Sequence, residues 1–279
     1  MKIRIIILVI FLCSCASATF ADLKKDIEFA KPNGISLKLD AYVPDGKGPF
    51  PTVIIVHGGG FTKGDQRMFV PPLFPVLTEA GFAWFTIDYR LYPQANFPDN
   101  AYDVETAIRW IKAHAKEYKV DLKKLVLMGE SAGGTLVSYD AVRVKSDTRV
   151  TAVVVFYGVH DWAMRHEDEL AGRVAPSAWR DVFKIPKDGD PTQSKVLQDV
   201  SAITYIKKGL PPFLLIHGTD DKQVSYQQSV QFQKKMTAIG NACELITVEG
   251  GPHGMGVINN FPETKVKMIA WMKKTLKIK

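Results

Sequence analysis

The chain has 279 residues, 46% of them hydrophobic and 23% charged, an ordinary composition for one globular domain. It excludes collagen, a coiled coil and an intrinsically disordered chain. The formal net charge is +7, but the basic residues are scattered and form no block of five. We therefore expect a solvated surface with a mild attraction to anionic polymers, and no nucleic-acid partner.

The start of the chain differs from the rest. Lys2 and Arg4 precede an unbroken apolar run over residues 5–12, and small residues follow as far as Ala21. This order is typical of a secretory signal peptide, and the run is too short to span a bilayer as a helix. We expect a signal peptide over residues 1–21 and a secreted or periplasmic mature protein without a transmembrane segment; a buried N-terminal strand is the alternative.

Cleavage after Ala18 or after Ala21 would satisfy the preference for small residues, and we favour Ala21 because Asp22 begins a polar segment. The residues before Cys15 partly resemble a bacterial lipoprotein box, so lipid anchoring through Cys15 is a second alternative. Cleavage would leave Cys243 as the one cysteine, which excludes an intramolecular disulfide in the mature chain. Cys243 lies in an apolar stretch and is expected to be buried.

Two kinds of strand are expected. Alternating apolar and polar residues on either side of Asn33-Gly34 predict an antiparallel hairpin with one face in water. Short continuous apolar runs follow, and such runs predict strands of a parallel sheet covered on both faces. These runs span residues 53–57, 82–87, 125–128, 152–156 and 213–217.

Helical patterns alternate with the apolar runs. They cover residues 100–117, 132–144, 225–239 and 261–276, with a last strand near 244–248. The alternation predicts an α/β domain over residues 22–279, with a mostly parallel central sheet, an antiparallel N-terminal hairpin and helices on both faces. Residues 159–210 are irregular, and we interpret them as a candidate partial cap over a site in preference to a long surface connection.

One motif indicates a nucleophile. Gly129-Glu130-Ser131-Ala132-Gly133 matches the pattern G-x-S-x-G. On its own the pattern is weak, because a serine between glycines is common in turns. Here it directly follows an apolar strand and opens a helix, the context in which it holds a serine on a tight turn. The glycines leave room for neighbouring backbone and the helix N-terminus favours negative charge, so Ser131 is the expected nucleophile.

A glycine run indicates where an oxyanion would be held. His57-Gly58-Gly59-Gly60 follows an apolar strand, and glycines let backbone N–H groups approach a reacting oxygen. The N–H groups of Gly59, Gly60 and Ala132 are the expected oxyanion hole. The alternatives are a plain turn and a phosphate-binding loop; a phosphate loop is disfavoured because no Lys-Ser/Thr pair follows and no G-x-G-x-x-G pattern forms.

The remaining candidates are acids and histidines. Asp220 and Asp221 follow an apolar strand, where a carboxylate can orient a histidine, and the pattern leaves the choice between them open. His253 lies in a loop after the last strand, and the order serine, aspartate, histidine is the one that this arrangement requires. His160 and His166 lie in the candidate cap at a spacing that fits no standard zinc site, so we expect a surface role and no metal.

Together these motifs resemble the α/β-hydrolases of the hormone-sensitive-lipase-like and the feruloyl/acetyl-xylan-esterase-like (BD-FAE-type) families. The matching segments occur in chain order and cover nearly all of the mature chain. They are His57-Gly-Gly-Gly-Phe61, Asp88-Tyr-Arg-Leu-Tyr-Pro93, Phe97-Pro98, Gly129-Glu-Ser-Ala-Gly-Gly134, Pro211-Pro-Phe-Leu-Leu-Ile-His-Gly218, Asp221 with Val224, and His253-Gly254.

The resemblance implies an α/β-hydrolase fold and a triad in which Ser131 is the nucleophile, His253 the general base and Asp221, rather than Asp220, the acid. It implies no cofactor. Asp88 and Arg90 are expected to hold the loop that follows their strand. The long N-terminal cap segment of many hormone-sensitive-lipase relatives is missing, so we expect the shorter esterase-like branch and an open site.

The expected function is that of a secreted serine carboxylesterase that forms an acyl-enzyme. Its expected substrates are short-chain acyl, acetyl or feruloyl esters, either small molecules or esters linked to plant polysaccharide. An amidase or formamidase is one alternative, because such enzymes resemble this constellation. A non-catalytic binding protein on a hydrolase scaffold is another, although such proteins usually lose the nucleophile or its base. The sequence leaves the oligomeric state open.

Overall fold

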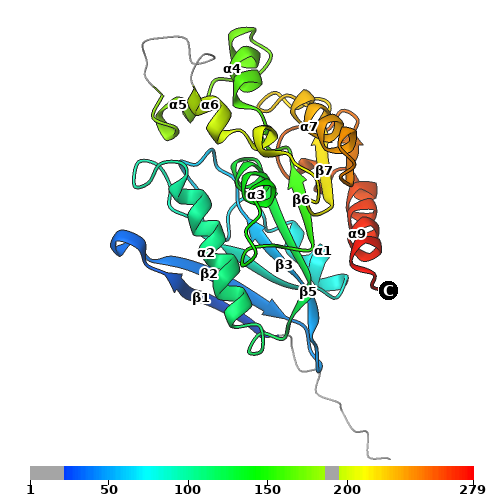
Figure 1. Ribbon diagram of the computed structural model, residues 1–279. Helices are drawn as coiled ribbons and strands as arrows, with labels where there is room; N and C mark the ends of the chain where they lie inside the picture. Colours follow the sequence, from blue (N-terminus) through cyan, green and yellow to red (C-terminus); the bar gives the residue numbers. More distant parts are fainter. Residues whose placement is uncertain (1–21, 186–194) are drawn as a thin grey trace, which may run out of the picture.

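The computed structural model describes residues 22–185 and 195–279. The expected signal peptide over residues 1–21 lies outside the described residues, as does Cys15. Within the described part of the chain, no helix has the length and apolar character needed to cross a bilayer. The described residues form a central sheet with helices on both sides (Figure 1).

The sheet has eight strands in the order β1-β2-β4-β3-β5-β6-β7-β8. β1 pairs antiparallel with β2 and β2 pairs antiparallel with β4, whereas all other neighbours are parallel. The strands are β1 (Asp22–Ala30), β2 (Leu37–Val43), β3 (Phe50–Val56), β4 (Ala83–Ile87), β5 (Val120–Glu130), β6 (Ala152–Phe156), β7 (Phe213–Gly218) and β8 (Cys243–Val248). This arrangement is the α/β-hydrolase fold, and it confirms the expected mostly parallel sheet with an antiparallel N-terminal hairpin.

The helices are distributed over both faces of the sheet and over its upper end. They are α1 (Leu73–Glu79), α2 (Asp99–Ala113), α3 (Ala132–Val142), α4 (Trp162–Leu170), α5 (Trp179–Val182), α6 (Lys195–Val200), α7 (Gln227–Ala238), α8 (Gly256–Asn259) and α9 (Pro262–Leu276), with short 3-10 turns η1 (Pro32–Gly34) and η3 (Ala202–Tyr205). The buried side chains of α2, α3 and α7 share one core cluster, and those of α1, α8 and α9 share another.

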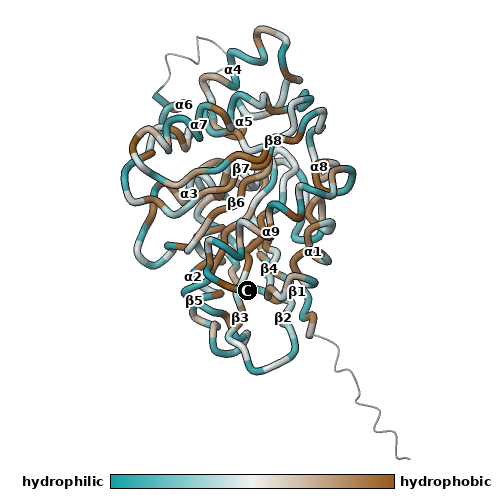
Figure 2. Tube along the Cα trace, turned by 90° about the vertical axis from the view of Figure 1, so that its right-hand side faces the viewer, coloured by the Kyte–Doolittle hydropathy of each residue, from teal (hydrophilic) through white to brown (hydrophobic). Residues whose placement is uncertain are grey.

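Successive residues of a strand explain why two cores form. In β3, Ile54 and Val56 pack in the core under α2 and α3, whereas Val53 and Ile55 pack in the core under α1 and α9. Side chains of a strand alternate between the two faces, so a strand covered on both faces must be apolar at every position. The hydropathy colouring shows this, because β6 and β7 are brown along their length (Figure 2).

Some boundaries differ from the sequence-based expectation. β5 begins at Val120 rather than at Leu125. Val120 is buried and pairs with Phe50 of β3, but the polar residues that follow it, such as the exposed Lys123, interrupt the apolar run in the sequence. α2 ends at Ala113 rather than at residue 117. Cys243 is 6% exposed, which confirms its expected burial.

The parallel strands end on one side of the sheet, and the candidate residues follow those ends. Ser131 follows β5, Asp221 lies three residues beyond β7, and His253 lies in the loop after β8. The described parts of the expected cap, α4 to α6, lie above the same side (Figure 1). In open α/β sheets ligands bind outside the carboxyl ends of the strands, so this is where a site is expected.

Candidate active site

Ser131 occupies a strained turn between β5 and α3. Its φ is 52° and its ψ is −118°, a backbone conformation that residues with a side chain rarely adopt. Gly133 makes the turn sterically feasible, because a Cβ there would collide with the carbonyl oxygens of Val56 and His57 at the end of β3. The turn therefore holds the Ser131 side chain at the start of α3, whose first N–H groups have no partner within the helix.

The structure brings the expected serine, histidine and aspartate into contact. Ser131 Oγ lies 3.0 Å from Nε2 of His253, and Nδ1 of His253 lies 2.7 Å from Oδ2 of Asp221. An ionised carboxylate only accepts hydrogen bonds, so Nδ1 carries the proton and Nε2 is left to accept the Ser131 hydroxyl proton. The arrangement can thus transfer a proton away from Ser131.

Asp221, and not Asp220, is the partner of His253. Its Oδ1 accepts hydrogen bonds from the backbone N–H groups of Gln223 and Val224, both at 2.8 Å, and its side chain is fully buried. Burial alone would raise the pKa of this carboxyl, but hydrogen bonds from His217 and His253 outweigh burial and lower it. Asp221 is therefore an anion at neutral pH.

Asp220 points elsewhere. Its carboxylate forms an ion pair with Lys222 at 2.6 Å, and its side chain is 59% exposed. The two adjacent aspartates thus have separate environments, and only Asp221 can orient His253.

The glycine run after β3 supplies unpaired N–H groups. Gly59 has a φ of 100°, and a Cβ there would collide with the carbonyl oxygen of Lys63. Within the described residues, no acceptor is bound to the N–H of Gly59, Gly60 or Ala132, and all three residues line one cavity with Ser131. Unpaired N–H groups beside the nucleophile are what an oxyanion hole requires, so these three donors remain the candidates.

His57 holds the beginning of this glycine run. It is fully buried, its Nδ1 donates to the carbonyl of Gly58 at 2.8 Å, and its ring stacks on Tyr89 with 4.4 Å between centroids. The Tyr89 hydroxyl lies 3.1 Å from the carbonyl oxygens of His57 and of Gly58. Burial lowers the pKa of His57 to about 4, so the ring is neutral at neutral pH. His57 is thus suited to shaping the loop and not to exchanging protons.

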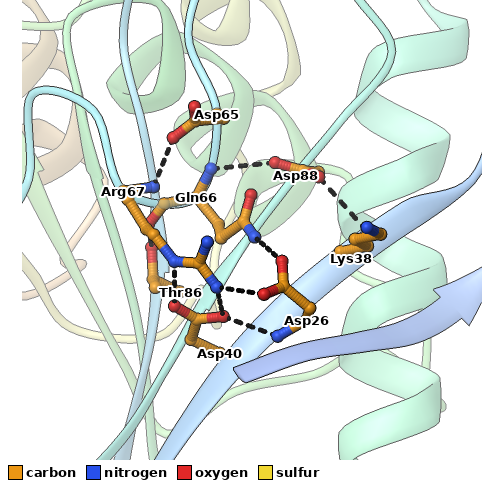
Figure 3. A network of polar contacts seen from close by, with 8 residues as sticks. All are labelled: Asp26, Lys38, Asp40, Asp65, Gln66, Arg67, Thr86 and Asp88. Atoms are coloured by element: carbon orange, nitrogen blue, oxygen red, sulfur yellow. Dashed lines mark hydrogen bonds and ion pairs between the residues drawn. The ribbon is translucent and has the colours of Figure 1, made fainter. Parts of the chain in front are cut away.

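A polar network ties the end of the same loop to the sheet (Figure 3). Asp88, just after β4, accepts hydrogen bonds from the backbone N–H groups of Gln66 at 2.8 Å and Lys38 at 3.3 Å. Thr86 donates its hydroxyl to the Gln66 carbonyl at 2.6 Å. Both backbone groups of Gln66 are thereby fixed to β4. Burial raises the pKa of Asp88 to about 6.

Arg67 extends this network to the N-terminal hairpin. Its Nε lies 2.7 Å from Asp40 and its Nη2 lies 2.8 Å from Asp26 (Figure 3). The hydrogen bonds that Arg67 donates to both carboxylates raise its pKa.

A separate ion pair lies at the loop after β4. There Arg90 contacts Asp103 on α2, and their closest atoms are 2.8 Å apart. Arg90 thus holds the loop after β4, as expected, whereas Asp88 holds the loop after β3 through Gln66 and not the loop after its own strand.

A cavity of about 430 Å³ opens beside Ser131. One part of its wall comes from the glycine loop, from Ser131 and from His253, and the other part comes from the candidate cap. The cap residues are Val159, Trp162, Arg165 and the stretch 175–179. The described part of residues 159–210 therefore forms a wall of the site.

The expectation of a surface role for His160 and His166 is wrong. His160 is fully buried and stacks on Phe232, and His166 is 4% exposed and packs against Trp179. Burial lowers the pKa of His160 to about 3, so it behaves as a neutral aromatic ring. The spacing of these two histidines in the sequence argued against a zinc site, but it could not show whether their side chains are buried. Among the described residues, no cluster of histidine, cysteine or carboxylate side chains could hold a metal ion.

Comparison with known proteins agrees with the fold. The BD-FAE family model matches residues 39–236, which is more than half of the chain. The chain belongs to the BD-FAE family. This BD-FAE protein is 35% identical over 202 residues to the probable carboxylic ester hydrolase LipM of Mycobacterium tuberculosis, an alignment that covers 69% of this chain and 46% of LipM.

Solved structures share the fold of this BD-FAE protein. A truncated form of a carbohydrate esterase from gut microbiota aligns with a TM-score of 0.79 at 24% identity, covering 94% of this chain and 99% of that one. A bifunctional GH43-CE protein of Bacteroides eggerthii aligns with a TM-score of 0.78 at 28% identity, covering 91% of this chain and 38% of that one. The chain spans about half the length of the curated relatives that it matches first.

Sequence reasoning missed several residues of the site. Trp162 and Arg165 line the cavity from α4, and His217 contacts the Asp221 carboxylate at 3.3 Å. The sequence pattern included His217 in the His-Gly segment at the end of β7. Its contact with Asp221 depends on how the turn after β7 folds back, which the pattern does not show. Nothing in the irregular pattern of residues 159–210 identified which of its side chains face Ser131.

Proposed function

We propose that this BD-FAE protein is a serine-dependent carboxylic ester hydrolase that works through an acyl-enzyme. The observation that carries the proposal is the continuous contact from Ser131 Oγ through His253 to Asp221, with Ser131 in a strained turn. The relatedness to proteins described as ester hydrolases supports the same activity.

Acylation begins when His253 Nε2 takes the proton of Ser131 as Oγ attacks the carbonyl carbon of the ester. The carbonyl oxygen becomes an oxyanion, which the N–H groups of Gly59, Gly60 and Ala132 stabilise. One such donor contributes about 3 kcal/mol of transition-state stabilisation. Asp221 stabilises the positive charge on His253 during this step. Collapse of the intermediate breaks the ester C–O bond, and His253 gives its proton to the departing alcohol.

Deacylation repeats these steps with water. His253 Nε2 takes a proton from water, the hydroxide attacks the acyl carbon, and the same N–H groups hold the second oxyanion. The acid then leaves as the Ser131 oxygen regains a proton from His253. The cycle consumes one water and needs no oxidant, reductant or cofactor.

The proposed substrates are short-chain acyl, acetyl or feruloyl esters, free or attached to plant polysaccharide. A cavity of about 430 Å³ accepts a small acyl group together with part of its alcohol. Export to the periplasm or the medium, with cleavage near Ala21, is part of the proposal and rests on residues 1–21 alone. A time course of hydrolysis on acetylated xylan, methyl ferulate and 4-nitrophenyl acetate would rank these substrates.

The decisive experiment compares Ser131→Ala with Ser138→Ala. Both serines lie at or on α3, but Ser138 donates its hydroxyl to Gly134 and does not line the cavity. We expect Ser131→Ala to abolish turnover of 4-nitrophenyl acetate and labelling by a fluorophosphonate probe, while Ser138→Ala keeps both. Turnover by Ser131→Ala at a substantial fraction of the wild-type rate would refute the assignment.

Two alternative functions can be tested on the same purified protein. An amide hydrolase would cleave N-formyl amides faster than matched esters. A binding protein on this scaffold would remain folded but unlabelled by the fluorophosphonate, even with Ser131, His253 and Asp221 intact.

A further inference from the structure

Phe69 occupies a strained turn in the loop between β3 and α1. Its φ is 66°, and across it the N–H of Val70 donates to the carbonyl of Met68 at 2.8 Å. Such a bond around a residue of positive φ is the pattern of the less common kind of γ-turn, which is rare and strained. A positive φ is unfavourable for a bulky side chain, so the backbone alone would favour glycine at this position.

The chain is fixed on both sides of Phe69. Before it, Gln66 and Arg67 are held by the polar network that joins the loop to β4 and to the N-terminal hairpin (Figure 3). After it, Val70 is fully buried in the core under α1 and α9. Strained backbone persists only where the surrounding structure determines it, and it is concentrated at functional sites.

Packing of the Phe69 ring does not account for the strain. The side chain is 39% exposed, and within the described residues it belongs to neither core cluster and pairs with no other aromatic ring. Phe61, in the same loop, has a similar φ of 65° but is 3% exposed and packs against Trp162 and Phe183. Burial therefore compensates for the conformation of Phe61 but not for that of Phe69.

The exposed ring lies at the reacting end of the cavity. A Cβ added to Gly59 would be 3.1 Å from Cε2 of Phe69, so the ring lies against the glycine whose N–H is a candidate oxyanion donor. Phe69 and Ser131 line the same cavity of about 430 Å³. An ester whose carbonyl group reaches both Ser131 and Gly59 therefore has one of its two ends near the ring.

The surroundings of Phe69 suit a flat, apolar group. From the cap, the same cavity is lined by the exposed residues Ala175, Pro176 and Ala178, whose side chains are small and apolar. Two aromatic rings in stacked or edge-to-face contact gain binding energy beyond the area that they bury. A compact acetyl or propionyl group would leave most of the Phe69 ring in water.

We propose that Phe69 is a specificity-determining residue that packs on an aromatic ring of the substrate, so that the preferred esters carry such a ring. This inference rests on the proposed ester hydrolysis at Ser131. The ring lies on the acyl part or on the alcohol part of the ester, and matched substrates distinguish the two.

The first experiment compares flat rings with saturated rings of similar size. Methyl 3-phenylpropanoate against methyl 3-cyclohexylpropanoate tests the acyl part, and benzyl acetate against cyclohexylmethyl acetate tests the alcohol part. In at least one pair we expect the wild type to have the higher kcat/KM for the aromatic ester. Phe69→Leu keeps an apolar side chain without the flat face and should lower the ratio of the two kcat/KM values about three- to tenfold.

Two controls separate recognition from support of the loop. Met68→Ala alters a neighbouring side chain that is 43% exposed but does not line the cavity, and it should leave the ratio unchanged. Phe69→Tyr keeps the ring and should retain the preference. A ring that only supports the loop would make Phe69→Leu lower kcat/KM for both members of a pair equally, and that result would overturn the proposal.

Phe69→Gly decides the matter if Phe69→Leu does not fold. Glycine adopts a φ of 66° without steric cost, so this variant removes the ring and the strain together and is expected to fold. Its ratio of kcat/KM values should fall at least as far as that of Phe69→Leu. An aromatic preference that survives in Phe69→Gly would refute the role of the ring.

A binding measurement is independent of turnover. Saturation-transfer NMR of Ser131→Ala should detect binding of 3-phenylpropanamide or of benzyl alcohol, and Phe69→Gly in the same background should weaken it. If the wild type cleaves esters but shows no aromatic preference and Ser131→Ala binds neither probe, the role of Phe69 is refuted while the proposed function stands. If no ester is cleaved yet a probe binds through Phe69, the aromatic subsite stands and the proposed function fails.

Discussion

His217 Nε2 lies 3.3 Å from Asp221 Oδ2, the carboxylate oxygen that is also 2.7 Å from Nδ1 of His253. On its other side, His217 Nδ1 lies 2.7 Å from the hydroxyl of Ser229 on α7. The Ser229 hydroxyl can donate to Nδ1, which leaves the Nε2 proton of His217 for the carbonyl of Val224 and for Asp221. The chain of contacts from Ser131 therefore continues beyond the triad into the core.

His217 is expected to act as a positioning residue for Asp221. Its replacement by Phe keeps an aromatic ring in a fully buried position but removes one donor to the carboxylate. We expect kcat to fall about tenfold, as for the loss of a hydrogen bond to a charged group, with KM nearly unchanged because His217 does not line the cavity. Ser229→Ala should give a smaller loss of kcat; a rise in KM alone would argue against positioning.

The neighbouring aspartates provide a matched pair. Asp221→Asn removes the charge that stabilises protonated His253 and disturbs its tautomer, so kcat should fall by about four orders of magnitude. Asp220→Asn alters an exposed ion pair with Lys222 and should leave kcat within about twofold. Steady-state hydrolysis of 4-nitrophenyl acetate measures both. Equal effects of the two substitutions would contradict the separate environments of the two carboxylates.

The role of Gly59 can be tested by comparison with Gly81, which has a similar backbone conformation. Gly59→Ala would place a methyl group against the Lys63 carbonyl and displace the loop, so we expect kcat to fall by about 100-fold or more. Gly81 has a φ of 83° but open space around it, so Gly81→Ala should cost about 1 kcal/mol of stability and little activity. Comparable kcat values for Gly59→Ala and Gly81→Ala would contradict the assignment of Gly59 to the oxyanion hole.

Asp88 is expected to make stability depend on pH. Burial raises its pKa in the folded chain to about 6, above the ordinary value of 3.8. Between these values the folded chain keeps a proton that the unfolded chain has released, so the free energy of unfolding falls as pH rises from about 4 to about 6. Asp88 is half-buried, and we expect a change of about 2 kcal/mol.

Urea unfolding at several pH values would measure this dependence. Asp88→Asn cannot titrate and should lose the fall between pH 4 and pH 6, relative to the wild type. Asp45→Asn, at an exposed turn, should keep it. An unchanged pH profile in Asp88→Asn would show that other groups cause the dependence.

The sequence by itself determined the layers of the fold and singled out Ser131 as the expected nucleophile. Continuous apolar runs such as residues 53–57 indicated strands covered on both faces, since each side chain of such a strand must meet a core. Short-range geometry also predicted the tight turn at Ser131, because a strand, a glycine, a serine and a helix in immediate succession allow few other conformations. These features depend on residues near one another in the chain.

Only the tertiary structure decided which distant groups meet. The burial of His160, the contact of His217 with Asp221 and the position of Arg165 in the cavity wall all depend on how segments far apart in sequence pack together. Residues 159–210 have no dominant period, so no pattern could assign a face to Arg165. Its environment follows from the contacts that the cap wall makes with the rest of the fold, and those contacts are not encoded in local spacing.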